Sequence, residues 1–299
     1  MKHLLTVGTL SRADIEGLLE RSAQIKRGAR RPQKTCAGRT LGLLFDKPST
    51  RTRVSFEAAM HRLGGATICM HSSTTQLGRG ETPADTARVL SRYLDALVVR
   101  TFSQRLVEEL AQAASIPIIN GLTDDHHPCQ VLSDLMTVQE KKGRLAGFKI
   151  AWVGDGNNVA NSWLEAAGVL GLTLHLACPP GYEPRPEFVE FARRGGAEVV
   201  VGHDPLEAAR GAAVINTDVW ASMGQEAERA ERLKVFAPYQ VNEELLAVAG
   251  PECIVLHCLP AHRGEEITDA VIDGPHSAVW EQAENKLHLH QALLEGLLA

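Results

Sequence analysis

The chain has 299 residues, of which 44% are hydrophobic, and a formal net charge of −5. The length and apolar content allow a full core and favour two domains over one, while the acidic balance disfavours nucleic acid as a partner. No apolar stretch approaches the roughly 20 residues of a membrane span, and no secretory signal is visible near Met1. The six cysteines form no C-x-x-C pair, so we expect reduced thiols, no metal site and a cytoplasmic location.

The first strong pattern is a strand, a polar turn and a helix. The apolar run at residues 40–45 predicts a buried strand, and residues 54–63 predict a helix that ends at two glycines. Between them lies Asp46-Lys47-Pro48-Ser49-Thr50-Arg51-Thr52-Arg53. Helix N-termini attract anions, and hydroxyl and guanidinium groups suit phosphate. The turn is therefore a candidate phosphate site; the alternative is an ordinary capped helix with two solvated arginines.

Two further polar positions follow strands in the first half of the chain. Residues 96–101 predict a buried strand that carries Arg100 near its end, where parallel sheets bind ligands. A strand at 116–120 and a helix from residue 131 place His127 and Gln130 at a second strand-to-helix turn. We expect this turn on the same side of the sheet as residues 49–53. The alternatives are an edge salt bridge for Arg100 and a plain loop position for His127.

The second half of the chain opens with the same pattern. Residues 149–153 predict a strand, a Gly-rich turn follows, and residues 159–170 predict a helix. A dinucleotide enzyme is the obvious rival, but the pattern G-x-G-x-x-G is not met, because Ala160 or Asn161 stands where the third glycine is wanted. Asn157 and Asn158 offer amide groups that suit a carboxylate ligand instead.

Later strands add an acid and a thiol. Residues 212–218 predict a strand that ends in Asp218, which Ser222-Met223-Gly224 follow in a polar loop. The charged stretch at 225–234 predicts a solvated helix or mobile segment. Residues 253–260 predict the last strong strand, which contains His257-Cys258-Leu259-Pro260, and residues 281–298 predict a long amphipathic helix.

The alternation of strand and helix, twice over, predicts an α/β fold. We expect two doubly wound parallel-sheet domains, with the active site in the cleft between them. The expected domains are residues 1–136 and residues 137–283. Residues 284–299 are expected to form a C-terminal helix that packs back on the first domain.

The four polar motifs occur in the order seen in carbamoyltransferases. Ser49-Thr50-Arg51-Thr52, His127-Pro128-Cys129-Gln130, the Asp218 to Gly224 segment and His257-Cys258-Leu259-Pro260 resemble that family, and the last two are similar to the ornithine carbamoyltransferase versions. The resemblance covers nearly the whole chain. It implies transfer of the carbamoyl group of carbamoyl phosphate to the δ-amine of L-ornithine, giving L-citrulline and phosphate in arginine metabolism, with no cofactor and no metal.

The resemblance also implies which residues touch each substrate. The implied carbamoyl phosphate contacts are Ser49, Thr50, Arg51, Thr52, Gln76, Arg100, His127, Pro128, Cys129, Gln130, Cys258, Leu259 and Lys286. The implied ornithine contacts are Asn158, Asp218, Ser222 and Met223. Gln76 matches a loop residue that reaches the phosphate of a neighbouring subunit, which implies a homotrimer. Lys286 is a departure, since the family has an arginine there; lysine keeps the charge but loses the planar fork.

The residue types fit the implied chemistry. The cationic set can hold a phosphate and polarise a carbonyl, so Arg100 and His127 are expected to stabilise the oxyanion as the amine attacks. The amine must lose a proton, and Asp218 or a Cys258 thiolate is the candidate acceptor; a buried, inert Cys258 is the alternative.

Other functions remain open from the sequence. The acceptor could be aspartate, putrescine or an acetylated ornithine instead of ornithine. Aspartate would call for a cationic pocket, putrescine has no carboxylate for Asn158, and an acetylated amine would not need Asp218. An NAD-dependent dehydrogenase and a non-catalytic binding protein are the other two classes. Anabolic and catabolic carbamoyltransferases share these site residues, so the sequence does not distinguish the two roles.

Overall fold

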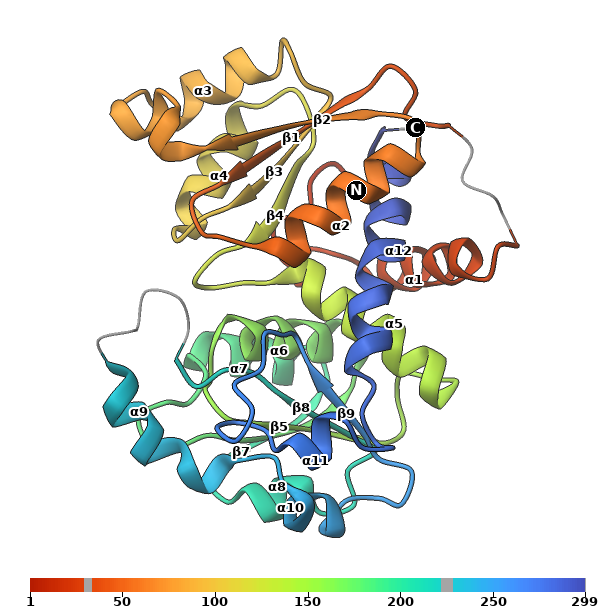
Figure 1. Cartoon of the computed structure of the whole chain (residues 1–299), viewed down its shortest axis with the longest axis vertical. Helices are drawn as coiled ribbons and strands as arrows, with labels where there is room; N and C mark the ends of the chain where they lie inside the picture. Colours follow the sequence, from red (N-terminus) through yellow and green to blue (C-terminus); the bar gives the residue numbers. More distant parts are fainter. Residues whose placement is uncertain (30–33, 222–227, 299) are drawn as a thin grey trace. The chain divides into compact units, whose positions relative to one another are not determined.

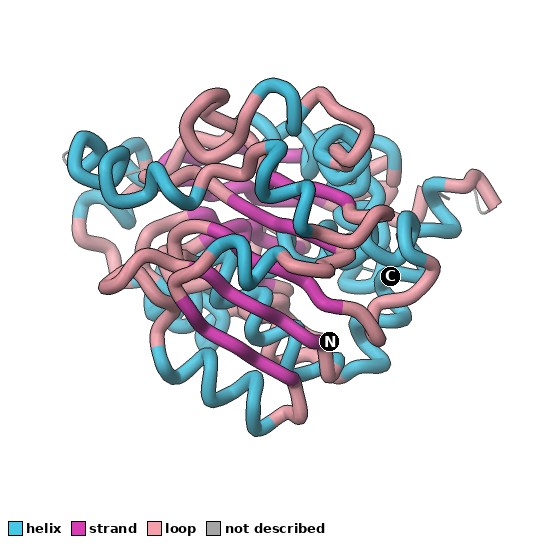
Figure 2. The backbone as a smooth tube through the Cα atoms, turned by 90° about the horizontal axis from the view of Figure 1, so that it is seen from below, coloured by secondary structure: helices cyan, strands magenta, loops and turns pink. Residues whose placement is uncertain are grey.

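The chain folds into two compact α/β units. The computed structural model describes residues 1–29, 34–221 and 228–298. One unit comprises Met1–Ser133 and Glu284–Ala299, and the other comprises Asp134–Ala283. Each is built on a parallel β-sheet covered by helices (Figure 1), and the strands lie side by side among the helices when the backbone is viewed from below (Figure 2). The predicted fold class, with two parallel sheets and alternating helices, is confirmed.

The elements of the first unit follow the alternating order that the sequence predicts. Its strands are β1 (Thr40–Phe45), β2 (Ala66–His71), β3 (Ala96–Arg100) and β4 (Ile118–Leu122). Its helices are α1 (Arg12–Lys26), α2 (Thr50–Arg62), α3 (Pro83–Leu90), α4 (Gln104–Ala113), the first residues of α5 (Pro128–Lys142) and most of α12 (Val279–Leu298), with short 3-10 turns η1 (Ser72–Thr74) and η2 (Leu77–Arg79).

The elements of the second unit repeat that alternation. Its strands are β5 (Lys149–Val153), β6 (Thr173–Ala177), β7 (Glu198–Gly202), β8 (Val214–Thr217) and β9 (Ile254–His257). Its helices include α6 (Asn158–Leu170), α7 (Pro186–Arg194), α8 (Pro205–Ala209), α9 (Arg229–Phe236), the 3-10 turn η4 (Ala237–Tyr239), α10 (Glu243–Val248) and α11 (Asp269–Ile272).

The order of the strands fixes where ligands can bind. The sheets run β2-β1-β3-β4 and β7-β6-β5-β8-β9, and all these strands are parallel. The chain therefore reverses direction across the sheet between β1 and β3, and again between β5 and β8. Loops diverge at such switch points and leave room for a ligand at the carboxyl ends of the strands. Several predicted polar residues lie at these strand ends: Ser49 follows β1, Arg100 ends β3, Asn158 follows β5 and Asp218 follows β8.

The central strands are buried because helices cover both faces of each sheet. Every residue of β3 is buried, as expected of a continuous apolar run in a parallel sheet. In the first unit Leu97 and Val99 pack in one cluster with Val107 of α4. In the second unit Val153, Ile215 and Val255 share another. These rigid cores hold the strand ends in register.

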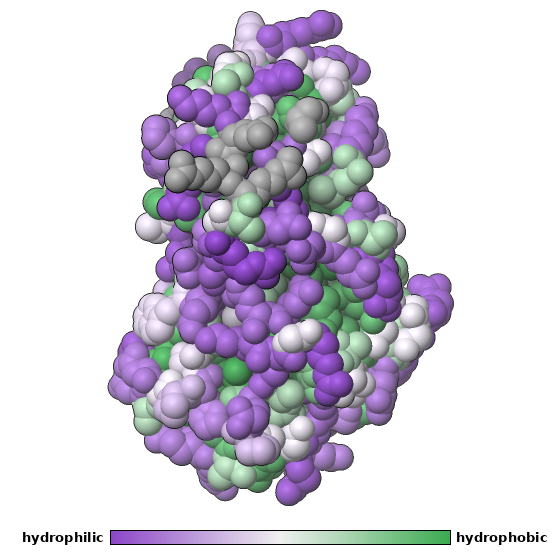
Figure 3. Space-filling view, turned by 90° about the vertical axis from the view of Figure 1, so that its right-hand side faces the viewer, coloured by the Kyte–Doolittle hydropathy of each residue, from purple (hydrophilic) through white to green (hydrophobic). Residues whose placement is uncertain are grey.

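One face of the molecule is predominantly polar (Figure 3). Figure 3 shows one face on which hydrophilic residues predominate and hydrophobic residues lie in smaller groups. Among the residues that the structure describes, no helix combines the length and the apolar character needed to cross a membrane.

Candidate functional site

The turn after β1 is a helix N-terminus rich in donors. Helix α2 begins at Thr50, so Thr50, Arg51 and Thr52 all lie in its first turn, four residues before the predicted start. Ser49 is the N-cap, and its hydroxyl accepts a hydrogen bond from the Thr52 backbone N–H (3.2 Å). The first turn holds no acidic residue that would compete for the N–H groups. It can therefore bind an anion such as phosphate.

Two residues before this turn tie it to the neighbouring strand. The Asp46 N–H donates to the Arg100 carbonyl (2.8 Å), and Thr101 Oγ1 donates to the Asp46 carboxylate (2.6 Å). Lys47 is buried, forms an ion pair with Asp124, and lies over the Phe102 ring at 4.1 Å from its centroid. Sequence reasoning missed the role of Lys47, because a lone lysine in a polar turn is usually solvated.

Buried polar residues gather at the ends of β3 and β4. Arg100, His127 and Gln130 are all buried, and Lys286 of α12 donates a hydrogen bond to Gln130 Oε1 (2.9 Å). Burial lowers the pKa of His127 well below 6.5, and the positive charges of Lys286, Arg100 and His290 lower it further. His127 is therefore a neutral imidazole at pH 7, while Arg100 and Lys286 supply the positive charge. The structure thus brings four of the predicted residues together.

Three other predicted residues of this set have different surroundings. Pro128 is the first residue of α5, where its missing N–H costs nothing. Cys129 is fully buried, its thiol donates to the Asn120 carbonyl (3.5 Å), and burial raises its pKa to about 12. This thiol stays protonated and packs in the core. Gln76 is exposed between η1 and η2, and its carbonyl accepts the N–H groups of Arg79 and Glu81.

The turn after β5 is the corresponding strand-to-helix turn of the second unit. Asn157, not Asn158, caps α6: its Oδ1 accepts the N–H groups of Val159 (2.9 Å) and Ala160 (3.2 Å). Gly156 is required, since a Cβ there would lie 2.2 Å from the Pro184 backbone nitrogen. Gly156 thus serves close backbone packing. Asn158, the predicted contact, is half-buried at the first position of the helix.

Asp218 is held from several sides at the end of β8. Asn157 Nδ2 donates to its Oδ2 (2.8 Å), and both Cys258 Sγ (2.8 Å) and the Val219 N–H (2.8 Å) donate to its Oδ1. The Asp218 side chain is buried, so this arrangement fixes a carboxylate in one orientation. In this network the Cys258 thiol is assigned as the donor and the Asp218 carboxylate as the acceptor. Ser222 and Met223, the other predicted ornithine contacts, lie outside the described residues.

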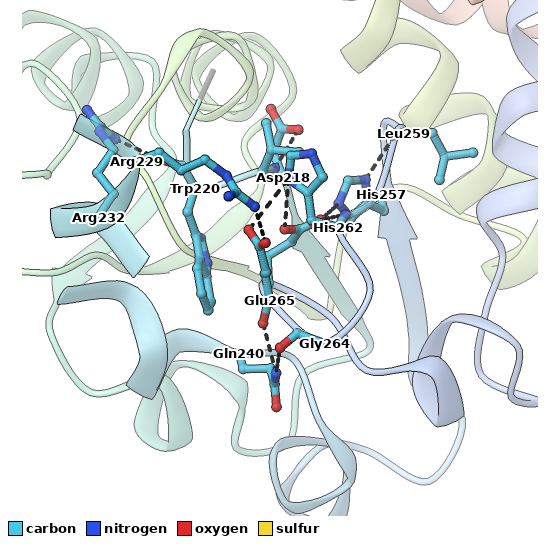
Figure 4. Close-up of polar contacts among 12 residues, drawn as sticks. Asp218, Trp220, Arg229, Arg232, Gln240, His257, Leu259, His262, Gly264 and Glu265 are labelled. Carbon is cyan, nitrogen blue, oxygen red and sulfur yellow. Dashed lines mark hydrogen bonds and ion pairs between the residues drawn. The ribbon is translucent and has the colours of Figure 1, made fainter. Parts of the chain in front are cut away.

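The segment after β9 is set by a buried His257–Glu266 pair. Figure 4 shows His257 and Leu259 of this segment. His257 Nε2 lies 3.0 Å from Glu266 Oε1, and His257 Nδ1 accepts the Leu259 N–H (2.9 Å). Hydrogen bonding therefore assigns the proton to Nε2. Leu259 has a φ of 56°, a conformation that costs a residue with a side chain roughly 1 kcal/mol. His257 and Glu266 hold this strained turn, which places Cys258 beside Asp218.

Two groups of side chains bring metal-ligating atoms within 4.8 Å of one another. They are Asp218, His257 and Cys258, and His262, Glu265 and Glu266. In the first, the Asp218 oxygens already accept three hydrogen bonds. In the second, Glu265 is paired with Arg229. Their existing partners account for both groups.

Comparisons with known proteins show the family of the chain. Residues 2–140 match the model for the "Aspartate/ornithine carbamoyltransferase, carbamoyl-P binding domain", and residues 146–297 match the corresponding "Asp/Orn binding domain". The chain belongs to the aspartate/ornithine carbamoyltransferase family.

Individual relatives resemble the chain over its full length. The ornithine carbamoyltransferase of Desulfotalea psychrophila is 54% identical over 301 residues, which span 99% of each chain. That of Geobacter sulfurreducens is 50% identical and spans 100% of this chain and 99% of the relative. The solved ornithine carbamoyltransferase of Pyrococcus furiosus superposes with a TM-score of 0.93 at 49% identity, covering 98% of this chain and 96% of that one.

Proposed function

We propose that this chain is an ornithine carbamoyltransferase that converts carbamoyl phosphate and L-ornithine to L-citrulline and phosphate. The observation that carries the proposal is the fixed Asp218 carboxylate, which suits the ammonium of an amino acid. The family match and the full-length likeness to ornithine carbamoyltransferases support the same function.

The first unit supplies the donor half of the reaction. The first turn of α2, with Ser49, Thr50, Arg51 and Thr52, holds the phosphate. Arg100 and the neutral His127 donate to the carbamoyl oxygen, which becomes an oxyanion as the amine attacks. Lys286, in place of the family arginine, adds positive charge and holds the amide of Gln130.

The second unit supplies the acceptor half. Asp218 receives the α-ammonium of ornithine, and Asn158 serves the α-carboxylate together with a backbone N–H at the start of α6. The δ-amine attacks the carbamoyl carbon, the bond to the phosphate oxygen breaks, and phosphate leaves. Direct transfer requires both substrates to be bound at once, and their fixed orientation lowers the barrier.

Asp218 is the better candidate for assisting loss of the amine proton. The thiol of Cys258 points its hydrogen at Asp218, so it is a donor in this network and not a thiolate base. The δ-amine can give its proton to the Cys258 sulfur as the thiol gives its own proton to the Asp218 carboxylate, so the sulfur carries one proton before and after the transfer. Cys258 then links the reacting nitrogen to Asp218.

The remaining parts of the proposal concern assembly and location. Exposed Gln76 is available to complete the phosphate site of a neighbouring subunit, which supports a homotrimer. All six cysteines are thiols, as expected in the reducing cytoplasm. Size measurement in solution and a Gln76→Ala variant test the first point. We expect a trimer whose Gln76→Ala form has a raised KM for carbamoyl phosphate.

The test of the reaction itself is an acceptor panel. Purified protein is given carbamoyl phosphate with ornithine, aspartate, putrescine or acetylornithine, and each carbamoylated product is measured. We expect turnover with ornithine alone. Turnover with another acceptor would leave the donor half in place and overturn the assignment of Asp218. No turnover in folded protein would favour a binding protein.

A further inference from the structure

Arg232 of α9 joins two segments of the acceptor half. Its Nη1 donates to Asp155 Oδ2 (3.0 Å) and to the Trp220 carbonyl oxygen (2.9 Å). Asp155 lies in the turn that carries Asn157, and Trp220 follows Asp218 by two residues. A single guanidinium nitrogen therefore sets the spacing between the two segments that hold the Asp218 carboxylate. Figure 4 shows Arg232, Trp220 and Asp218 in this part of the second unit.

The surroundings of Arg232 fix it in place. Although the sequence predicts a solvated segment here, the Arg232 side chain is buried. Its Nε donates to Glu228 Oε2 (3.0 Å), and its guanidinium lies 4.8 Å from the Tyr182 ring centroid and 5.7 Å from that of Phe236. Arginine is well suited to such a site, because its planar fork can donate in several directions and stack on rings at once.

The Asp155 side of this contact is equally constrained. Trp152 Nε1 donates to the Asp155 backbone oxygen (2.9 Å), and the Asp155 carboxylate is buried. Burial raises the Asp155 pKa to about 6, and the charge of Arg232 opposes that rise. Asp155 is therefore an anion at pH 7. Removing Arg232 would leave a buried charge without its counter-ion, which distorts or protonates the turn.

The geometry assigns Arg232 a role as a positioning residue for ornithine binding, through the Asp155–Asn157 turn and the Asp218–Trp220 segment. This inference rests on the proposed function, because it takes Asp218 as the ornithine contact. Arg232 does not touch substrate itself. It keeps Asn157 within reach of Asp218, and the donor half in the other unit does not depend on it.

The test compares Arg232→Lys and Arg232→Met with a control on the same helix. Arg229→Met removes an exposed arginine that pairs with Glu265, so it controls for loss of an ion pair from α9. For each variant, kcat and the KM values for ornithine and for carbamoyl phosphate are measured with ornithine as the acceptor. The melting temperature of each variant is measured as well. We expect Arg232→Met to raise the KM for ornithine about 10- to 100-fold, as loss of charged hydrogen bonds does. The KM for carbamoyl phosphate stays within about twofold.

Two comparisons separate positioning from simple loss of stability. Arg232→Lys keeps the charge and should give a smaller rise in the KM for ornithine than Arg232→Met. Asp155→Asn keeps the hydrogen bond from Arg232 to the Trp220 carbonyl, and it should also raise the KM for ornithine. If Arg232→Met does not fold, the other two variants carry the test. Arg229→Met should resemble the wild type.

The outcomes distinguish the two proposals. A folded Arg232→Lys protein whose KM for ornithine is unchanged would overturn the positioning role alone. An equal rise in both Michaelis constants would also overturn it, because the effect would then be general. A wild-type protein that does not use ornithine would overturn the proposed function and, with it, this inference.

Discussion

Cys258 donates a hydrogen bond to Asp218 across 2.8 Å. The direction of this hydrogen bond determines which substitutions at residue 258 preserve it. Serine keeps a donor at the same place, whereas alanine leaves Asp218 without one of its partners. We expect Cys258→Ala to lower kcat/KM for ornithine by about 10- to 100-fold and Cys258→Ser by clearly less. Steady-state kinetics on both variants test this. A serine variant as poor as the alanine variant would instead indicate a thiolate base.

Asn157 has two roles that substitutions can separate. Its Oδ1 caps α6, and its Nδ2 holds Asp218. Asn157→Asp keeps the cap but places a second carboxylate beside Asp218, so we expect near-normal stability and a raised KM for ornithine. Asn157→Ala loses both roles and should also lower the free energy of unfolding by about 1 kcal/mol. Urea unfolding and steady-state kinetics measure the two effects. If Asn157→Asp and Asn157→Ala lower the free energy of unfolding equally, aspartate does not preserve the helix cap.

Lys286 adds positive charge near His127. Its charge contributes, after burial, to the lowered pKa of His127. We expect Lys286→Met to raise the His127 pKa and to raise the KM for carbamoyl phosphate about 10-fold, while Lys286→Arg leaves activity intact or lowers that KM. Titration of the His127 ring by NMR gives the first value, and kinetics gives the second. An unchanged KM in Lys286→Met would remove Lys286 from the site.

Asp155 makes stability depend on pH in a direction opposite to that of most carboxylates. Its pKa is about 6 in the fold, against an ordinary 3.8, because burial outweighs the attraction of Arg232; Asp218 and Glu228 raise it further. Between these values the folded protein keeps a proton that the unfolded chain has lost. The group therefore stabilises the fold below about pH 4, and this contribution disappears as the pH rises to about 6.

Asp155→Asn removes that dependence. We expect the unfolding free energy of the wild type, minus that of the variant, to fall as the pH rises from about 4 to about 6.5. Urea unfolding at several pH values measures the difference. A difference that stays flat across this range would show that the carboxyl titrates normally.

The strands were predictable because each is a short apolar run followed by a turn. Residues 40–45, 96–101 and 149–153 show this pattern, and they became β1, β3 and β5 with little change. Helix starts were harder. Helix α2 begins at Thr50 because Ser49 caps it, whereas the apolar periodicity starts only at Val54. The polar residues at 49–53 both begin the helix and form the candidate phosphate site. The pattern of hydrophobic residues indicates only where the apolar face of the helix begins.

Residues that work through distant partners could not be found from the sequence. Arg232 lies in a highly charged stretch, which predicts a solvated segment. This prediction is wrong for the Arg232 side chain, which is buried. Its partner Asp155 lies 77 positions away. Glu266 and His257 are close in sequence, yet nothing in their spacing shows that both are buried. Burial and pairing of charges depend on tertiary packing, which only the fold reveals.

The duplicated topology has an evolutionary consequence. In the proposed function, each substrate is bound at its own reversal of strand order, one between β1 and β3 and the other between β5 and β8. Substitutions in the segment after β8 can therefore retune which amine is accepted without disturbing the machinery that activates the carbamoyl group. A lineage built on this plan can change its product by altering a few positions in one half, while the other half is inherited intact.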